Sequence, residues 1–181
     1  MNYLIKTGKH HSKRFPVLLL WKSKLHYSIR FDSSAIYNSR EVENQHDINK
    51  LVGFSDGFSW GRRLIYQSTS KGWRNSARIG WNWNPLNHCV DLWAYAYTSG
   101  KLQVKHLGEI AIGEEFQIVL QKAGDFYQFF LFKTGINPEG FELVELKRST
   151  RGGRIFGFKQ YPYFGGNETA PHNINISVKK L

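Results

Sequence analysis

The sequence predicts an all-β protein, an antiparallel β-sandwich or jelly roll of about ten strands. Apolar and polar residues alternate with a period of two in several segments, which is typical of strands with one buried and one solvent-facing side. Turn signals rich in Gly, Pro, Asn, Asp and Ser separate these segments at intervals of roughly 8–15 residues. No helical periodicity extends over more than about ten residues.

The first clear strand is predicted at residues 24–32. There Leu25, Tyr27 and Ile29 alternate with polar residues, so one face of this strand is expected to be buried. The polar segment 33–50 follows and predicts either a short helix or a long loop.

The centre of the chain predicts two further strands, at 75–84 and 88–98. Trp81 and Trp83 lie on the apolar side of the first of these, so we expect both in the core. Ser99-Gly100 suits a tight hairpin turn after the second strand. Additional strand-like segments occur at residues 102–107, 116–121, 126–133, 141–146, 155–163 and 173–179.

Length and composition favour one globular domain. The chain has 181 residues, of which 41% are hydrophobic and 15% aromatic, and this aromatic content excludes wholesale disorder. Residues 1–15 predict a basic N-terminal arm or edge strand, and residues 16–181 a single β-sandwich domain. No apolar stretch is long enough for a membrane-spanning helix, so membrane insertion is not expected. No export signal is visible, which makes a cytoplasmic location the default expectation.

Positive charge is the strongest compositional signal. The formal net charge is +11 and the isoelectric point about 9.8. The excess lies at the two ends: residues 1–31 contain basic but no acidic residues, and residues 146–181 contain a single acid. Such a chain favours anionic partners, among them acidic polysaccharides and nucleic acids.

A polar-aromatic strand face suggests a glycan-binding surface. In the segment 88–98, Val90, Leu92, Ala94 and Ala96 alternate with Asp91, Trp93, Tyr95 and Tyr97. Flat rings stack on sugar faces while their N–H and O–H groups bond to hydroxyls, although the same rings could form a core layer. Our primary hypothesis is a non-catalytic, lectin-like carbohydrate-binding domain without a cofactor. Its candidate ligand-binding residues are Arg78, Asn82, Trp93, Tyr95, Tyr97 and Tyr161.

Nucleic-acid binding is the first alternative. The segment Arg154–Tyr161 resembles a single-strand RNA-binding signature, with Ile155 in place of glycine and Lys159 in place of valine. Aromatic rings on a strand can stack on bases while the basic residues meet phosphates. The helices of the RNA-recognition fold are not predicted, so the case depends mainly on the basic ends.

A polysaccharide lyase acting on acidic glycans is the second alternative. Elimination needs a base such as Tyr or His, and cations or amides that neutralise a uronate carboxylate. Residues of the right type are Arg78, Asn82, His88, Tyr95, Tyr161 and His172. A two-carboxylate glycosidase is not expected, because no carboxylate pair lies on one strand face. We also expect no metal site, since the one cysteine excludes a cysteine cluster and no ligand spacing is apparent.

Three strings resemble an uncharacterised family of bacterial β-sandwich domains of the concanavalin A-like or jelly-roll class. They are Gly53–Gly57, Asn75–Trp81 and Tyr161–His172. The resemblance extends over about residues 50–181 and implies fold rather than activity. It assigns no catalytic residue, and the characteristic strings of alginate-lyase-like sandwiches are not intact.

Overall fold

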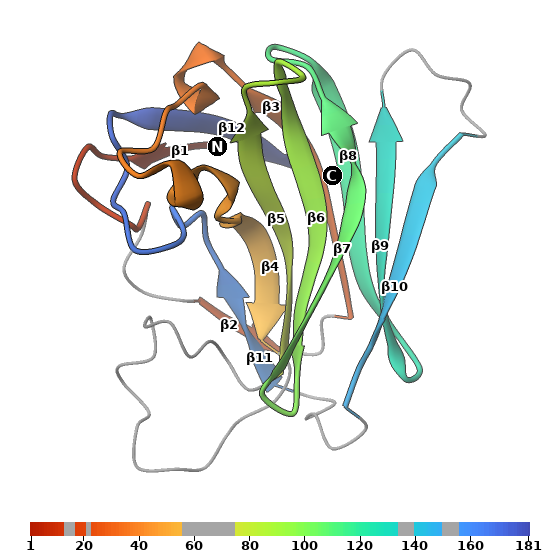
Figure 1. Ribbon diagram of the computed structural model, residues 1–181. Coiled ribbons are helices and arrows are strands. Elements are labelled where there is room, and N and C mark those ends of the chain that lie inside the picture. The colour runs from red at the N-terminus through yellow and green to blue at the C-terminus, as the bar shows by residue number, and fades with distance from the viewer. Residues whose placement is uncertain (13–16, 21–22, 56–74, 134–139, 150–155) are drawn as a thin grey trace.

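The computed structural model describes residues 1–12, 17–20, 23–55, 75–133, 140–149 and 156–181. Within these residues the chain forms two six-stranded antiparallel sheets, which confirms the predicted all-β fold (Figure 1). Sheet A contains, in spatial order, β1 (Asn2–Ile5), β12 (Ile174–Lys180), β3 (Lys24–Phe31), β8 (Glu115–Ala123), β9 (Phe126–Lys133) and β10 (Glu142–Lys147). Sheet B contains β2 (Val17–Leu20), β11 (Phe156–Gln160), β4 (Asn49–Ser55), β5 (Ser76–Asn84), β6 (Cys89–Thr98) and β7 (Lys101–Ile110).

The two sheets form two layers, and Figure 1 shows β5 and β6 of sheet B in front of β3 of sheet A. Strand alternation sends every second side chain between the layers. On β6 the inward residues are Val90, Leu92, Ala94 and Ala96, all fully buried as predicted. The small side chains at positions 94 and 96 let the two layers approach closely.

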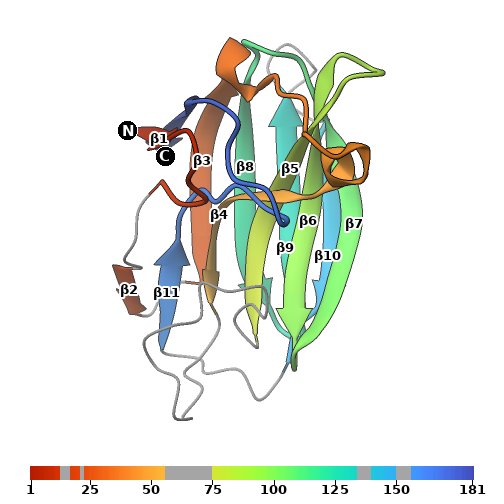
Figure 2. The same ribbon diagram turned by 60° about the vertical axis from the view of Figure 1, so that its left-hand side comes forward.

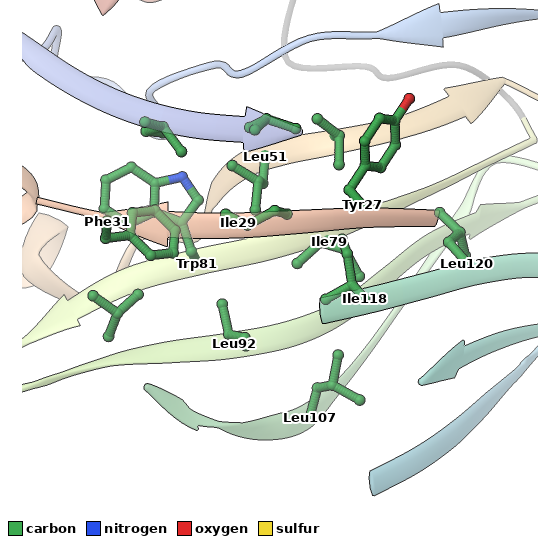
Figure 3. Close-up of a cluster of buried hydrophobic side chains, with 14 of the residues drawn as sticks. Tyr27, Ile29, Phe31, Leu51, Ile79, Trp81, Leu92, Leu107, Ile118 and Leu120 are labelled. Atoms are coloured by element: carbon green, nitrogen blue, oxygen red, sulfur yellow. The ribbon is translucent and has the colours of Figure 1, made fainter. Parts of the chain in front are cut away.

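Aromatic rings from both layers meet in the core (Figure 3). The Phe31 ring of sheet A lies 5.0 Å from the Trp81 ring of sheet B and 5.9 Å from that of Phe116. Tyr37, from the connection between β3 and β4, contacts Trp81 edge-on at 6.0 Å. Trp81 and Trp83 are buried, which confirms their predicted core position.

The connections follow the predicted turn chemistry. Ser99 and Gly100 have φ values of 54° and 83°, as a tight hairpin turn between β6 and β7 requires. The polar segment after β3 contains two short 3-10 helices, η1 (Ser33–Ala35) and η2 (Val42–His46). Asp32 caps η1 by accepting a hydrogen bond from the backbone N–H of Ser34. None of the described helices has the length and hydropathy that a membrane crossing requires.

Candidate functional site

Two rows of residues cross the outer face of sheet B, the face turned away from sheet A. Residues paired across neighbouring antiparallel strands point to the same side, so each row forms a contiguous surface. The first row consists of Gln160, Gly53, Arg78, Tyr95 and Val104. The second row consists of Tyr163, Lys50, Gly80, Trp93 and His106.

Arg78 is an enclosed cation without a carboxylate partner among the described residues. Its Nη2 donates a hydrogen bond to the carbonyl oxygen of Tyr161 at 2.6 Å, whereas its buried Nε has no partner in this part of the chain. Burial lowers the pKa of Arg78 to about 10, although the neighbouring Tyr95 and Tyr163 act in the opposite direction. Arg78 is therefore a half-buried cation that lacks the anion that normally compensates such a charge.

Lys50 is the second cation of this face. Its Nζ donates to the carbonyl oxygen of Ile48 at 2.7 Å and lies 5.0 Å from the centre of the Tyr95 ring. Burial and the charge of Arg78 lower the pKa of Lys50, the charge of Asp47 raises it, and together they place it at about 8. The charge of Arg78 therefore acts on the Lys50 amine.

Glycines lie next to both cations in the strand pairing, and one of them leaves room for the Arg78 side chain. A Cβ added to Gly53 would lie 2.1 Å from the carbonyl oxygen of Ala77 and 2.8 Å from Cγ of Arg78. The Arg78 side chain therefore occupies the space over β4, on its way towards Tyr161. A Cβ added to Gly80, opposite Lys50, would lie 2.4 Å from Cγ2 of Ile48.

Aromatic rings border the cations on the β6 side. Nε1 of Trp93 donates to Oδ1 of Asn82 at 2.6 Å, and the hydroxyls of Tyr95 and Tyr97 lie 3.4 Å apart. Trp93 and Tyr97 are half-buried and Tyr95 is 8% exposed, so these rings are partly rather than fully available. Burial raises the pKa of Tyr95 well above its ordinary value, so this phenol stays protonated near neutral pH.

Tyr163 forms the opposite border. Its backbone N–H and carbonyl both pair with Lys50, each at 2.8 Å. Its ring is stacked on that of His10 at 5.2 Å and meets that of His11 edge-on at 4.7 Å. These contacts bring the N-terminal residues, the start of β4 and the segment after β11 together, an arrangement that strand periodicity did not predict.

Five of the six predicted site residues lie on one surface: Arg78, Asn82, Trp93, Tyr95 and Tyr97. The sixth, Tyr161, does not share it. Its ring lines the interior side of the sandwich edge, 5.7 Å from the Tyr3 ring. Gln160 and Tyr163 both face outward although Tyr163 comes three residues after Gln160. In a regular strand, residues three apart point to opposite faces, so the alternation must be broken between these two. The partner strand β4 has a matching irregularity between Lys50 and Gly53. Tyr161 is directed inward at this break.

Two histidines expected to serve an elimination reaction lie elsewhere. His88 has a φ of 51° in the turn between β5 and β6, and it is exposed beside Trp83. Nε2 of His172 lies 2.8 Å from the carbonyl oxygen of Ser34, next to η1. His88 is therefore a turn residue, whereas His172 connects the segment before β12 to η1, and neither belongs to the two rows. Lys50 and Tyr163 occupy the site instead.

The nucleic-acid-like string lies on and around β11. Arg154 and Ile155 are outside the described residues, so the structure places residues 156–161 of this string. There, the Lys159 ammonium lies 5.1 Å from the Tyr27 ring and 5.3 Å from the Tyr161 ring, at the sandwich edge. A pocket of about 520 Å³ opens at this edge, lined by residues of β2, β3 and β11 among others. Figure 2 shows the place of these three strands in the fold. Its basic lining residues are Lys24, His26, Lys159 and Lys180.

Potential metal ligands also meet on the outer face of sheet B, beyond Trp93. Ligand atoms of Cys89, Asp91 and Glu109 lie within 4.8 Å of one another, and Nε2 of His106 lies 3.9 Å from Oδ1 of Asp91. Sulfur, oxygen and nitrogen donors of this kind suit zinc. Burial and the two carboxylates raise the pKa of the Cys89 thiol to about 11, so without a cation it remains protonated near neutral pH. The pairing of β6 with β7 assembles this group, so no sequence spacing indicated it.

Lys50 should make the stability of the protein depend on pH. The folded state releases the Lys50 proton from about pH 8, whereas the unfolded chain keeps it to the ordinary pKa of 10.5. The free energy of unfolding is therefore expected to rise between pH 8 and 10, on the order of 1–2 kcal/mol after solvent screening. Urea unfolding at several pH values measures this rise. A Lys50→Met variant with the same slope would show that the rise has another source.

No protein-family model and no curated protein matches the sequence. Solved structures do match in fold. The alginate lyase from Klebsiella pneumoniae has a TM-score of 0.60 at 11% identity, covering 88% of this chain and 59% of that chain. The alginate lyase AlyC3, solved with dimannuronate, has a TM-score of 0.54 at 10% identity, covering 99% of this chain and 73% of that chain. At such identities the likeness shows the fold alone, a jelly-roll β-sandwich, and the family resemblance holds only at that level.

Proposed function

We propose that this protein binds a polysaccharide that carries carboxylate groups along the outer face of sheet B. The observation that carries the proposal is the enclosed Arg78, which together with Lys50 lies among tyrosines and has no carboxylate partner in the described chain. A uronate carboxylate would supply the missing anion, and a guanidinium binds a carboxylate through two parallel hydrogen bonds.

The surrounding groups suit a sugar chain. Trp93 and Tyr97 present half-buried rings that can stack on pyranose faces, and Tyr163 provides a third ring across the two cations. Gln160 adds a buried amide in the Arg78 row whose oxygen and nitrogen both lack hydrogen-bond partners among the described residues. The two matching alginate lyases support a carbohydrate ligand at a coarse level.

A binding experiment with matched ligands tests the proposal. Native affinity electrophoresis should show retardation by alginate and by polygalacturonate, and little retardation by the same polymers after reduction of their carboxyl groups. Equal retardation by the reduced polymers would contradict the proposal, because the sugar would then bind without its charge. Single-stranded DNA is the comparison for the nucleic-acid alternative. Stronger binding to DNA, weakening steeply with salt, would favour that alternative.

Ring variants extend this test. Replacing Tyr97 with alanine should raise the Kd for the acidic polymer roughly three- to tenfold, the effect of losing about 1 kcal/mol of stacking. Phe141→Ala is the matched control, since it removes a 48% exposed ring that packs beside Phe130 on sheet A. If both variants weaken binding equally, the ligand does not lie specifically on the outer face of sheet B.

A further inference from the structure

The two cations of the outer face differ in what they can do. The guanidinium of Arg78 stays charged, whereas the amine of Lys50 can lose its proton. We propose that this face is the active centre of a polysaccharide lyase in which Lys50 is the base and Arg78 binds the uronate carboxylate. This inference deepens the proposed function and rests on it.

The reaction is a β-elimination that needs no added reactant. The neutral amine of Lys50 takes the proton from C5 of a uronate bonded through O4, and the C–H electrons form the C4=C5 double bond. The C4–O4 bond breaks, and the leaving oxygen takes a proton from the hydroxyl of Tyr95. The Lys50 ammonium then returns its proton to solvent, which also reprotonates Tyr95. Arg78 stabilises the charge that develops on the carboxylate when C5 loses its proton.

Lys50 has the geometry that a base requires. One of its N–H groups is used by the carbonyl oxygen of Ile48, which fixes the direction of the amine and leaves its lone pair for a substrate proton. No carboxylate among the described residues lies close enough to hold Lys50 as a permanent ammonium ion. With a pKa near 8, a substantial fraction of the amine is neutral at mildly alkaline pH.

Tyr95 suits the acid role rather than the base role. Nζ of Lys50 lies over the Tyr95 ring, and Tyr95 is paired directly with Arg78 between β6 and β5. The hydroxyl of Tyr97, 3.4 Å from that of Tyr95, can resupply the proton from the more exposed side. A phenol whose pKa is raised by burial donates a proton to a developing alkoxide and does not abstract one near neutral pH.

The pH dependence follows from the groups around Lys50. Arg78 faces it from β5, Tyr95 from β6, and Tyr163 from the segment after β11, with Asp47 two residues before β4. His10 and His11 pack against the Tyr163 ring. Of the groups that hold the reaction together here, Lys50 is the one whose pKa is lowered to about 8. We therefore expect kcat/KM to rise through about pH 8 and then to level off.

The experiment follows the ultraviolet absorbance of the conjugated double bond while alginate or polygalacturonate is incubated with the protein. Lys50→Arg and Lys50→Met should each lower kcat about 10²–10⁴-fold, and Lys50→Arg, which keeps the charge, should still bind the polymer. Tyr95→Phe should lower kcat with little change in binding. Lys101→Met, at the exposed start of β7, is the matched control and should keep full activity.

The outcomes separate the two proposals. If the wild-type protein binds the polymer but releases no unsaturated product, the lyase inference is wrong and the binding function stands. If no acidic polymer binds, both proposals are wrong. Product formation that Lys50→Met leaves unchanged, in a variant whose circular dichroism matches the wild type, would remove Lys50 from the base role.

Discussion

Replacing Arg78 with methionine is expected to weaken binding of an acidic polysaccharide roughly a hundredfold. The Arg78 side chain is half-buried, so its hydrogen bonds to a carboxylate would be made with less competition from water than on an exposed surface. The same change should leave the free energy of unfolding within about 1 kcal/mol of the wild type. It removes the hydrogen bond to Tyr161, but it also removes a half-buried charge that has no anionic partner in the described chain.

Isothermal titration calorimetry and urea unfolding measure the two effects on one protein preparation. Arg30→Met is the matched control, because Arg30 is an exposed arginine on the outer face of sheet A and its loss changes the net charge equally. Arg78→Lys should recover part of the affinity, since a single ammonium replaces the two-pronged contact. Equal weakening by Arg30→Met would show that overall charge, and not the Arg78 site, holds the polymer.

Trp81→Ala is expected to have the largest effect on stability, about 3–5 kcal/mol. The indole is fully buried between the layers, against Phe31 of sheet A and Tyr37. Its removal leaves a cavity where β5 supports the outer face. In a protein of this size, the expected fall in Tm is roughly 10 °C.

Differential scanning calorimetry measures this fall, and two further variants interpret it. Trp81→Phe should cost less than Trp81→Ala, because it keeps a ring and removes a buried indole N–H that has no hydrogen-bond partner among the described residues. Leu86→Ala, at an 85% exposed position, should change Tm very little. A similar loss of stability in all three variants would mean that Trp81 is not a central contact between the layers.

Local periodicity predicted most of the strands and the sides that they present, but it missed β4 (Asn49–Ser55), whose residues lay partly in the segment predicted to be a loop or short helix. The alternation from Val90 to Tyr97 predicted which residues of β6 enter the core, and the inward residues of that set are all fully buried. Ser99-Gly100 predicted the hairpin between β6 and β7. In the structure both residues have positive φ values, and two consecutive positive φ values are typical of a tight hairpin turn. These features depend on residues that are near one another in the chain.

The composition of the candidate site was decided by tertiary structure. The strand order β11-β4-β5-β6 brings Tyr163 beside Lys50, and Lys50 beside Tyr95, across large separations in sequence. Lys50 lay in a polar segment that predicted a loop or helix, so nothing local marked it as a partner of Arg78. The irregularities in strand alternation near Lys50 and Tyr161 also turn the Tyr161 ring towards the interior, although we expected it on the ligand-binding face. The sequence by itself determined which residues alternate, because backbone sterics act over only two or three residues. Which residues become neighbours across strands was decided by the tertiary structure, because burial of the apolar faces of both sheets selects the strand pairing.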